Sequence, residues 1–119
     1  LQYAHARISS IFRNAEERGV KVSNVADLSK LTHEAEIKLI QQLLRFPETV
    51  RSACERHEPQ LLADFLREIA AAFHIFYHEC RILGEEEGIM QARFKLAEVT
   101  KNAMKNGLTI LGISAPEKM

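Results

Sequence analysis

The first stretch of the chain places an aromatic ring beside a guanidinium at helical spacing. Tyr3, Arg7, Ser10 and Asn14 recur at steps of four, three and four residues, which puts them along one side of a helix. Tyr3 and Arg7 would be neighbours on the rim of the apolar face of that helix. A ring beside a guanidinium can stack on and clamp an unpaired base, although a solvated cation–π contact is the commoner result of such a pair.

A second polar rim runs along the helix predicted in the middle of the chain. Its members are Arg67, Ala71, His74, His78 and Arg81, with Tyr77 adjoining. His74 and His78 are four residues apart and could share a transition metal, but such a site needs at least one more ligand. The sequence offers no third ligand at a telling spacing, so two surface or half-buried histidines are the commoner explanation.

The sequence has none of the motifs typical of a catalytic domain. It contains no glycine-rich phosphate loop, no Gly-x-Ser-x-Gly and no His-Glu-x-x-His. Cys54 and Cys80 have no Cys-x-x-Cys spacing, so they indicate neither a disulfide framework nor a zinc ribbon. We expect both cysteines to be small buried hydrophobes, and we assign no catalytic residue and no metal ligand.

The composition is that of one globular domain without a strong attraction to polyanions. The chain has 119 residues, 46% of them hydrophobic, and its 16 Lys and Arg balance 16 Asp and Glu. A net charge of zero argues against an indiscriminate polyanion binder. The charge is nevertheless segregated, because residues 1–21 sum to +2, residues 22–88 to −5 and residues 89–119 to +3. No apolar run approaches the ~18 residues that a membrane helix needs.

The hydrophobic periodicity predicts an all-α fold, a single bundle of about five helices. The expected helices cover about 2–18, from a cap at Thr32 to Pro47, 47–56, 59–83 and 89–106. The segment 20–31 is predicted as a loop with one turn around 25–28, and 84–88 as a solvated turn. Asn106-Gly107 is a typical helix stop, after which residues 108–113 would carry the chain back over the core.

Three stretches together resemble one family. They are Leu1-Gln-Tyr-Ala-His-Ala-Arg-Ile-Ser-Ser-Ile, Phe73-His-Ile-Phe-Tyr-His-Glu-Cys-Arg-Ile-Leu83 and Leu108-Thr-Ile-Leu-Gly-Ile-Ser-Ala-Pro-Glu-Lys-Met119. In this order and at these separations they are similar to the C-terminal anticodon-binding domain of arginyl-tRNA synthetases, the DALR domain. The resemblance covers essentially the whole chain. One departure is Gln91-Ala-Arg-Phe94, which lacks the tetrapeptide behind the nickname.

The resemblance implies a role in holding the anticodon loop of arginine tRNA and receiving its central cytosine in a pocket. The pocket positions of the family correspond to Tyr3, Arg7, Tyr77 and Met119. His74, His78 and Arg81 are candidates for additional RNA contacts. No cofactor is implied for this domain, since ATP and Mg²⁺ serve the separate class I catalytic domain.

The resemblance also implies that residues 1–119 are a fragment of a longer cytoplasmic synthetase. The chain begins without Met, and it lacks the His-x-Gly-His and Lys-Met-Ser-Lys signatures of the catalytic domain. The implied partners are arginine tRNA and the catalytic domain of the same enzyme, with no membrane and no DNA, and the fragment alone should not aminoacylate. The alternative is a helical module that docks another protein through its rims or through exposed apolar surface at 108–113.

Overall fold

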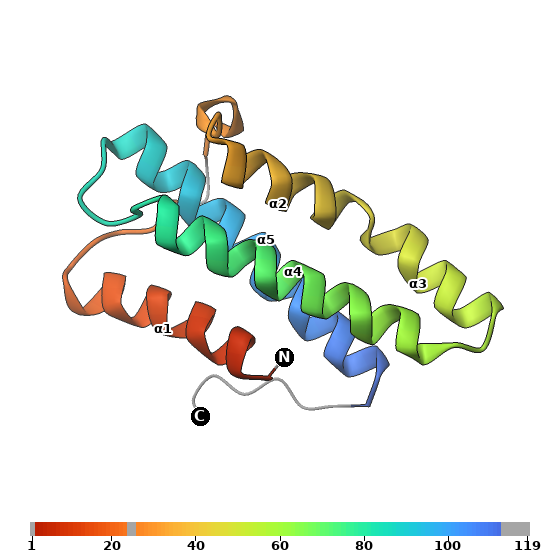
Figure 1. Cartoon of the computed structure of the whole chain (residues 1–119). Coiled ribbons are helices and arrows are strands. Elements are labelled where there is room, and N and C mark those ends of the chain that lie inside the picture. Colours follow the sequence, from red (N-terminus) through yellow and green to blue (C-terminus); the bar gives the residue numbers. More distant parts are fainter. Residues whose placement is uncertain (1, 24–25, 113–119) are drawn as a thin grey trace.

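Five α-helices account for most of residues 2–23 and 26–112, the parts of the chain that the structure, a computed structural model, describes (Figure 1). The elements are α1 (Gln2–Glu17), the 3-10 turn η1 (Leu28–Lys30), α2 (Glu34–Leu44), α3 (Phe46–Glu55), α4 (Pro59–Glu79) and α5 (Glu87–Ile110). These two ranges contain no strand. The predicted all-α bundle is therefore confirmed.

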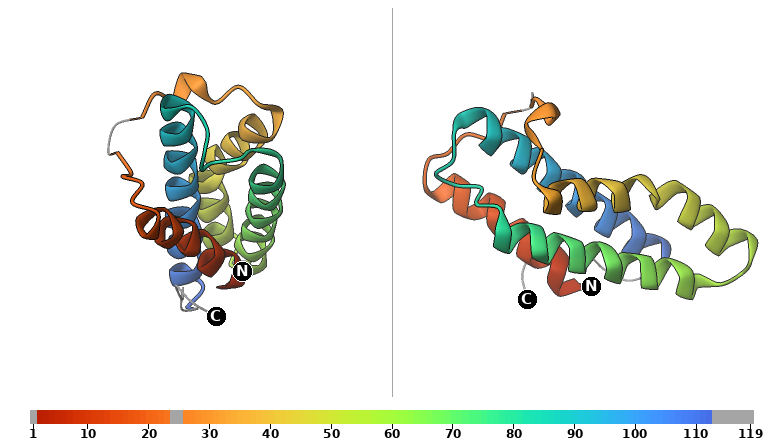
Figure 2. Two further views of the ribbon diagram at one scale, coloured as in Figure 1. Left: turned by 90° about the vertical axis from the view of Figure 1, so that its left-hand side faces the viewer. Right: turned by 45° about the horizontal axis from the view of Figure 1, so that its top comes forward.

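Helix α4 lies at the centre of the arrangement. Helices α2 and α3 follow one another along one side of α4, α5 crosses behind it in the opposite direction, and α1 packs on α5 (Figures 1 and 2). With 21 residues, α4 is about 30 Å long at the usual rise per residue. Its two ends therefore lie in different surroundings, the first beside α3 and the last beside α1.

The core is built on the apolar stripe that periodicity predicts for α4. Its buried residues are Leu62, Phe65, Leu66, Ile69, Phe73 and Phe76. Ring pairs extend this core to other helices: the centroids of Phe46 and Phe65 lie 6.2 Å apart, and those of Phe12 on α1 and Phe94 on α5 lie 5.8 Å apart. The core thus holds α1 to the bundle mainly through α5.

Two predicted helix boundaries, the start of the second helix and the end of the fourth, are wrong. Helix α2 is capped by His33 and not by Thr32: Nδ1 of His33 accepts a hydrogen bond from the Ala35 amide at 3.0 Å, and Glu36 Oε1 accepts one from the His33 amide at 2.9 Å. Helix α4 ends at Glu79 and not near Leu83, because the backbone becomes extended at Cys80. The turn predicted around 25–28 is η1, which begins after Asp27.

The predicted end of the last helix is also wrong. Helix α5 continues through Asn106-Gly107 to Ile110, and the left-handed glycine that follows is Gly112, with φ 78°. Gly107 serves close packing, because a Cβ at this position would lie 2.7 Å from Cδ1 of Leu66. Leu108 is consequently a buried helical residue, while Ile110 is 52% exposed; Ile113 lies outside the described residues.

The two cysteines differ in burial, which corrects the expectation for one of them. Cys80 is buried, as expected, but Cys54 is exposed. Helix α3 turns its neighbour Ala53 to the core instead, so Cys54 falls on the outer side. As for membranes, the described part of the chain contains no helix of the length and hydropathy needed for a span.

Candidate nucleic-acid interface

One contact brings together two residues of the predicted pocket. Arg7 of α1 lies over the ring of Tyr77 of α4, with 5.1 Å between Cζ and the ring centroid. The ring of Phe73, one turn earlier on α4, lies nearly parallel to Tyr77 at 17°, with the centroids 6.2 Å apart. Because Phe73 belongs to the core, Tyr77 is held from the inside and presents its remaining surface toward α1.

The guanidinium of Arg7 keeps one donor unused. Its Nε atom is buried and makes no hydrogen bond in the described structure. A buried N–H without an acceptor is costly, about 1–3 kcal/mol. A ligand that offers an acceptor here would remove that cost.

The other two residues of the predicted pocket cannot be placed in the same way. Tyr3 lies in α1, one helical turn before Arg7, but its side chain is outside what the structure describes. Met119 lies outside the described residues. The structure therefore brings Arg7 and Tyr77 together and leaves the roles of Tyr3 and Met119 as predictions.

Two exposed histidines continue the ring surface along α4. The rings of His74 and His78 meet edge to face, 4.4 Å between centroids, and His78 is 6.1 Å from the ring of Tyr77. Residues 2–23 and 26–112 contain no group of three His, Cys, Asp or Glu side chains placed to hold a metal ion. The geometry of this pair suits contacts to planar groups, such as bases.

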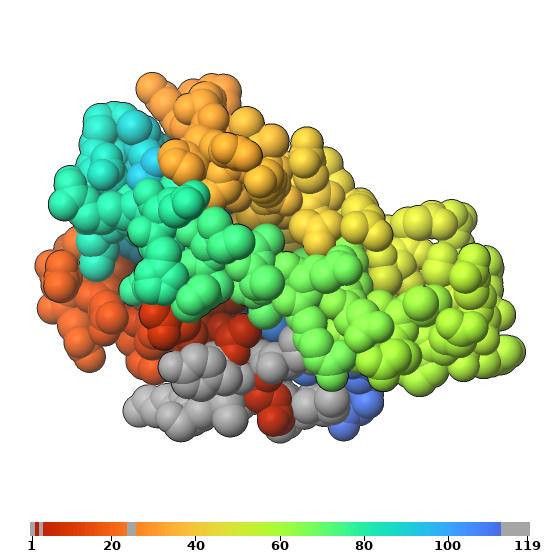
Figure 3. Space-filling view, in the orientation of Figure 1, coloured from red at the N-terminus to blue at the C-terminus, as the bar shows by residue number. Residues whose placement is uncertain are grey.

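An open cleft of about 490 Å³ lies next to this contact, between α1 and the end of α4. Its polar lining comes from Asn14, Arg18, Tyr77, His78, Glu79 and Arg81, and its apolar lining from Ile11, Cys80, Ile82 and Leu83. Figure 3 shows the surface of α1 directly beneath the last turns of α4. The cleft thus joins Arg81, a predicted RNA contact, to the ring of Tyr77.

Sequence reasoning missed Arg18 as a lining residue of the cleft. The signal was present, since Arg18 follows Asn14 by four residues and so continues the polar stripe of α1 by one helical turn. The polar stripe given above names residues only as far as Asn14.

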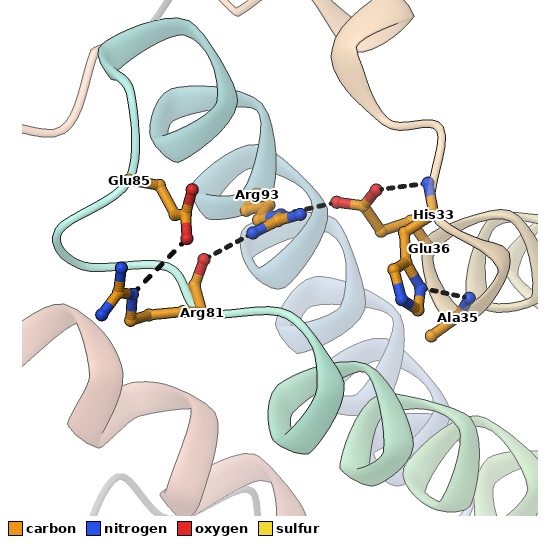
Figure 4. Close-up of polar contacts among 6 residues, drawn as sticks. All are labelled: His33, Ala35, Glu36, Arg81, Glu85 and Arg93. Atoms are coloured by element: carbon orange, nitrogen blue, oxygen red, sulfur yellow. Dashed lines mark hydrogen bonds and ion pairs between the residues drawn. The ribbon is translucent and has the colours of Figure 1, made fainter.

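The cleft wall that follows α4 is tied to two other helices (Figure 4). Nη1 of Arg93 on α5 donates to the carbonyl oxygen of Arg81 at 2.6 Å, and its Nε donates to Oε2 of Glu36 on α2 at 2.7 Å. The side chains of Glu36 and Arg93 are only 1% and 13% exposed. On the solvent side, Arg81 pairs with Glu85, with 3.4 Å between Nε and Oε1.

The segment that follows α1 is held to α5 by a single amide side chain. Gln91 accepts a hydrogen bond from the Ser23 amide at 2.7 Å and donates one to the Lys21 carbonyl at 2.8 Å. Gln91 and Arg93 both belong to the tetrapeptide in which the chain departs from the nickname motif of the family. The partners of Gln91 and Arg93 lie far away in the sequence and have no regular spacing from them, so these roles could not be predicted.

The buried thiol of Cys80, which lines the cleft, is poorly suited to act as a nucleophile. Burial raises the pKa of Cys80 above its usual value, an effect that the nearby Arg93 guanidinium only partly opposes. The thiol therefore stays protonated near neutral pH, and the thiolate is the reactive form.

Comparison with known proteins decides the family. The family described as the DALR anticodon binding domain matches residues 1–119. The chain belongs to this family. The expected family and fold are therefore confirmed, and the DALR fold is the bundle described above.

This DALR domain is similar in sequence to part of known arginine–tRNA ligases. The arginine–tRNA ligase of Salinibacter ruber is 51% identical over 119 residues, and that of Carboxydothermus hydrogenoformans is 45% identical over 121 residues. Both alignments include 100% of this chain but only 21% and 22% of the ligase. The chain thus spans about a fifth of the length of these relatives.

Solved structures show the same DALR bundle. The arginyl-tRNA synthetase of Thermus thermophilus superposes with a TM-score of 0.87 at 34% identity, over 99% of this chain and 20% of that one. The arginyl-tRNA synthetase of Plasmodium falciparum superposes with a TM-score of 0.77 at 26% identity, over 98% of this chain and 20% of that one.

Proposed function

We propose that the chain binds the anticodon loop of arginine tRNA and receives the central cytosine between α1 and α4. The observation that carries this proposal is the Arg7–Tyr77 contact, because an aromatic face beside a guanidinium suits an unstacked base. Membership in a family of anticodon-binding domains supports the RNA partner. The similarity to arginine–tRNA ligases supports arginine tRNA as the particular RNA.

Each residue of the proposed site has a distinct role. Tyr77 offers its ring to the base, and Arg7 offers donors, including the unused Nε, to the base or a phosphate. Tyr3 adds a second ring, and Met119 lays a polarizable side chain against the base. His74, His78 and Arg81 add contacts to the neighbouring nucleotides; their exposure supports this role.

In this proposal the chain is the anticodon-binding domain of a longer, cytoplasmic arginine–tRNA ligase. The catalytic domain of that enzyme would join arginine to tRNA with ATP and Mg²⁺, and the present domain would bind no cofactor. The chain aligns with only 21% of the Salinibacter ruber ligase and 20% of the Thermus thermophilus synthetase, which supports this proposal.

The test is a comparison of two RNA hairpins. The anticodon stem-loop of arginine tRNA should bind the chain at least about tenfold more tightly than the same hairpin with its central cytosine replaced, since a mismatched polar pocket leaves donors unpaired. Binding of both should weaken as salt rises, because phosphate contacts release counterions. Equal affinity for the two hairpins would exclude a cytosine pocket, and no binding of either would refute the proposal.

A second candidate function, docking of the catalytic domain in cis, is favoured by an apolar cleft at the opposite end of α4. This cleft of about 440 Å³ is lined by Val50, Ala53, Cys54, His57, Pro59, Leu62, Ile110 and Leu111. Ile110, which is 52% exposed, is the exposed large hydrophobic side chain of this lining. Ile110→Ser should weaken binding to the separately expressed catalytic domain and leave hairpin affinity unchanged; Thr109→Ser, next to it and exposed, is the matched control.

A further inference from the structure

We propose that Arg93 and Glu36 are positioning residues for RNA: together they fix the backbone at Arg81 and so set the shape of the cleft between α1 and α4. This inference rests on the proposed function, because it concerns the same RNA. Neither Arg93 nor Glu36 lines the cleft. Both would act through the segment that forms its wall.

The first step of the argument is that Glu36 is itself fixed. Its Oε1 accepts the His33 amide at the start of α2, and its Oε2 accepts Nε of Arg93. With both oxygens used and the side chain 1% exposed, the carboxylate has one position relative to α2. It therefore acts as a rigid anchor for the guanidinium.

The second step is that Arg93 transmits this position to Arg81. The guanidinium is planar, so Nε and Nη1 point in a fixed relation to one another. One donates to the Glu36 carboxylate and the other to the Arg81 carbonyl, as Figure 4 shows. A lysine has a single ammonium and cannot reproduce that fork, although it keeps the charge.

The third step is that the held carbonyl belongs to the part of the chain that shapes the cleft. Arg81 is the second residue after α4, and residues 77–83 supply one whole wall. Gly84, which follows, has a φ of 88°, a conformation that turns the chain toward α5. Within residues 2–23 and 26–112, no helical hydrogen bond holds the Arg81 carbonyl besides the bond from Arg93, because regular hydrogen bonding in α4 ends with the Cys80 amide.

A merely structural role would lower stability without a specific link to Arg81. The decisive experiment is therefore a cycle of Arg93→Lys, Arg81→Ala and the double variant, measured by binding to the arginine anticodon stem-loop. Arg93→Lys should weaken binding about tenfold, since small misplacements of a binding group have effects of this size. Arg81→Ala should weaken the unaltered chain but change affinity less than about twofold in the Arg93→Lys background, because the two act through one element.

Lys95→Arg is the matched control, because it preserves charge on the same helix and its partner is Glu98 on α5. It should leave affinity unchanged. The proposal is overturned if folded Arg93→Lys binds within about twofold of the unaltered chain, or if the effects of Arg93→Lys and Arg81→Ala simply multiply, as independent sites do.

If Arg93→Lys does not fold, Glu36→Gln replaces it in the same cycle, with the same outcomes. Hydrogen exchange of the unaltered chain, without RNA, provides a further arm: the Nε proton of Arg93, which is bound to the buried Glu36 carboxylate, should exchange more slowly than the Nε proton of Arg51, whose side chain is 63% exposed. Equally fast exchange would overturn the proposal whatever the variants do. Failure of the unaltered chain to bind the hairpin would refute the proposed function instead, while the exchange result would still report on the network.

Discussion

Arg7 and Tyr77 share a surface that a nucleobase would also need. The guanidinium lies over the ring, and the core holds the ring through Phe73. A base that stacks on Tyr77 must therefore enter beside Arg7 or move it. Either way the ring stays in place, and Arg7 is the adjustable partner because its side chain is long and flexible.

Replacement of Tyr77 separates stacking from hydrogen bonding. Tyr77→Ala should weaken binding to the anticodon stem-loop by about 1–3 kcal/mol, the usual value of one base–aromatic stack. Tyr77→Phe keeps the ring and should stay much closer to the unaltered chain. Titration of a fluorescent hairpin measures both, and an unchanged affinity of the alanine variant would remove Tyr77 from the site.

The two thiols should differ sharply toward alkylating or disulfide reagents. Cys54 is exposed and should react at once, whereas Cys80 is buried with a raised pKa and should react only after unfolding. The raised pKa also links stability to pH. The contribution of the protonated Cys80 thiol to the stability of the folded state is fully present below the pKa of the unfolded thiol, and it is lost as pH rises through the raised pKa of the folded state. Timed labelling with mass spectrometry should find one modified thiol in the native protein; two at equal rates would contradict the burial of Cys80.

The residues of the site were only partly predictable. Helical spacing put Tyr3 and Arg7 on one rim, and Tyr77 on another, but it carried no information on which rims meet. The likeness to a family supplied that pairing. Arg93, Glu36 and Gln91 could not be found from spacing, because their partners are backbone groups or side chains far away in the sequence.

At the scale of elements, Gly107 is a position of close contact between α4 and α5. Leu66 fills the space that a side chain would need there. Glycine has a low helix propensity, but its lack of a side chain allows the two long helices to contact one another here. An Asn-Gly pair, which in isolation indicates a helix end, is thus retained inside α5.

Gly107→Ala tests this explanation of the helix. Alanine should add about 1 kcal/mol of helix propensity, but insertion of a methyl group against Leu66 should cost about 1–3 kcal/mol. We expect a net loss of stability, seen as a lower midpoint in urea unfolding.

The neighbouring Asn106→Ala is the control for Gly107→Ala, because Asn106 is exposed. It should raise stability by a few tenths of a kcal/mol through propensity alone. A rise for both variants would show that α4 and α5 have room at this point.

Helix content and the apolar faces followed from periodicity, whereas helix ends did not. The stripe from Leu62 to Phe76 was predicted and is buried. Helix α4 ends before its predicted end, and just beyond that end Arg93 holds the Arg81 carbonyl; α5 continues through its predicted stop, where Gly107 packs on Leu66. Both differences are accompanied by contacts with residues on other helices, which a local pattern does not contain.

At the scale of the whole molecule, the Glu36–Arg93 pair links α2, α5 and the segment after α4. Glu36→Ala would leave the Arg93 charge buried without its carboxylate, a change that usually costs about 3–5 kcal/mol. We expect a correspondingly large fall in unfolding free energy by urea titration.

Glu34→Ala is the comparison for Glu36→Ala, since Glu34 lies on the same first turn of α2 and pairs with Lys38 in the open, with side chains 78% and 68% exposed. Loss of such an exposed pair should lower the free energy of unfolding far less than loss of the buried pair, because water screens the exposed charges. Similar losses for the two glutamates would mean that burial adds nothing to the inner pair.

The arrangement of the helices also makes the charge distribution of this neutral molecule uneven. Residues 1–21, which contain α1, sum to +2, residues 89–119, which contain all but the first two residues of α5, sum to +3, and residues 22–88, which contain α2 to α4, sum to −5. Since α1 packs on α5 while α2 and α3 lie on the other side of α4 (Figure 1), the opposite charges are partly separated in space as a dipole moment. In the field of a polyanion such a molecule experiences a torque and little net pull, so it can turn its α1 side toward an RNA before contact while remaining easy to release.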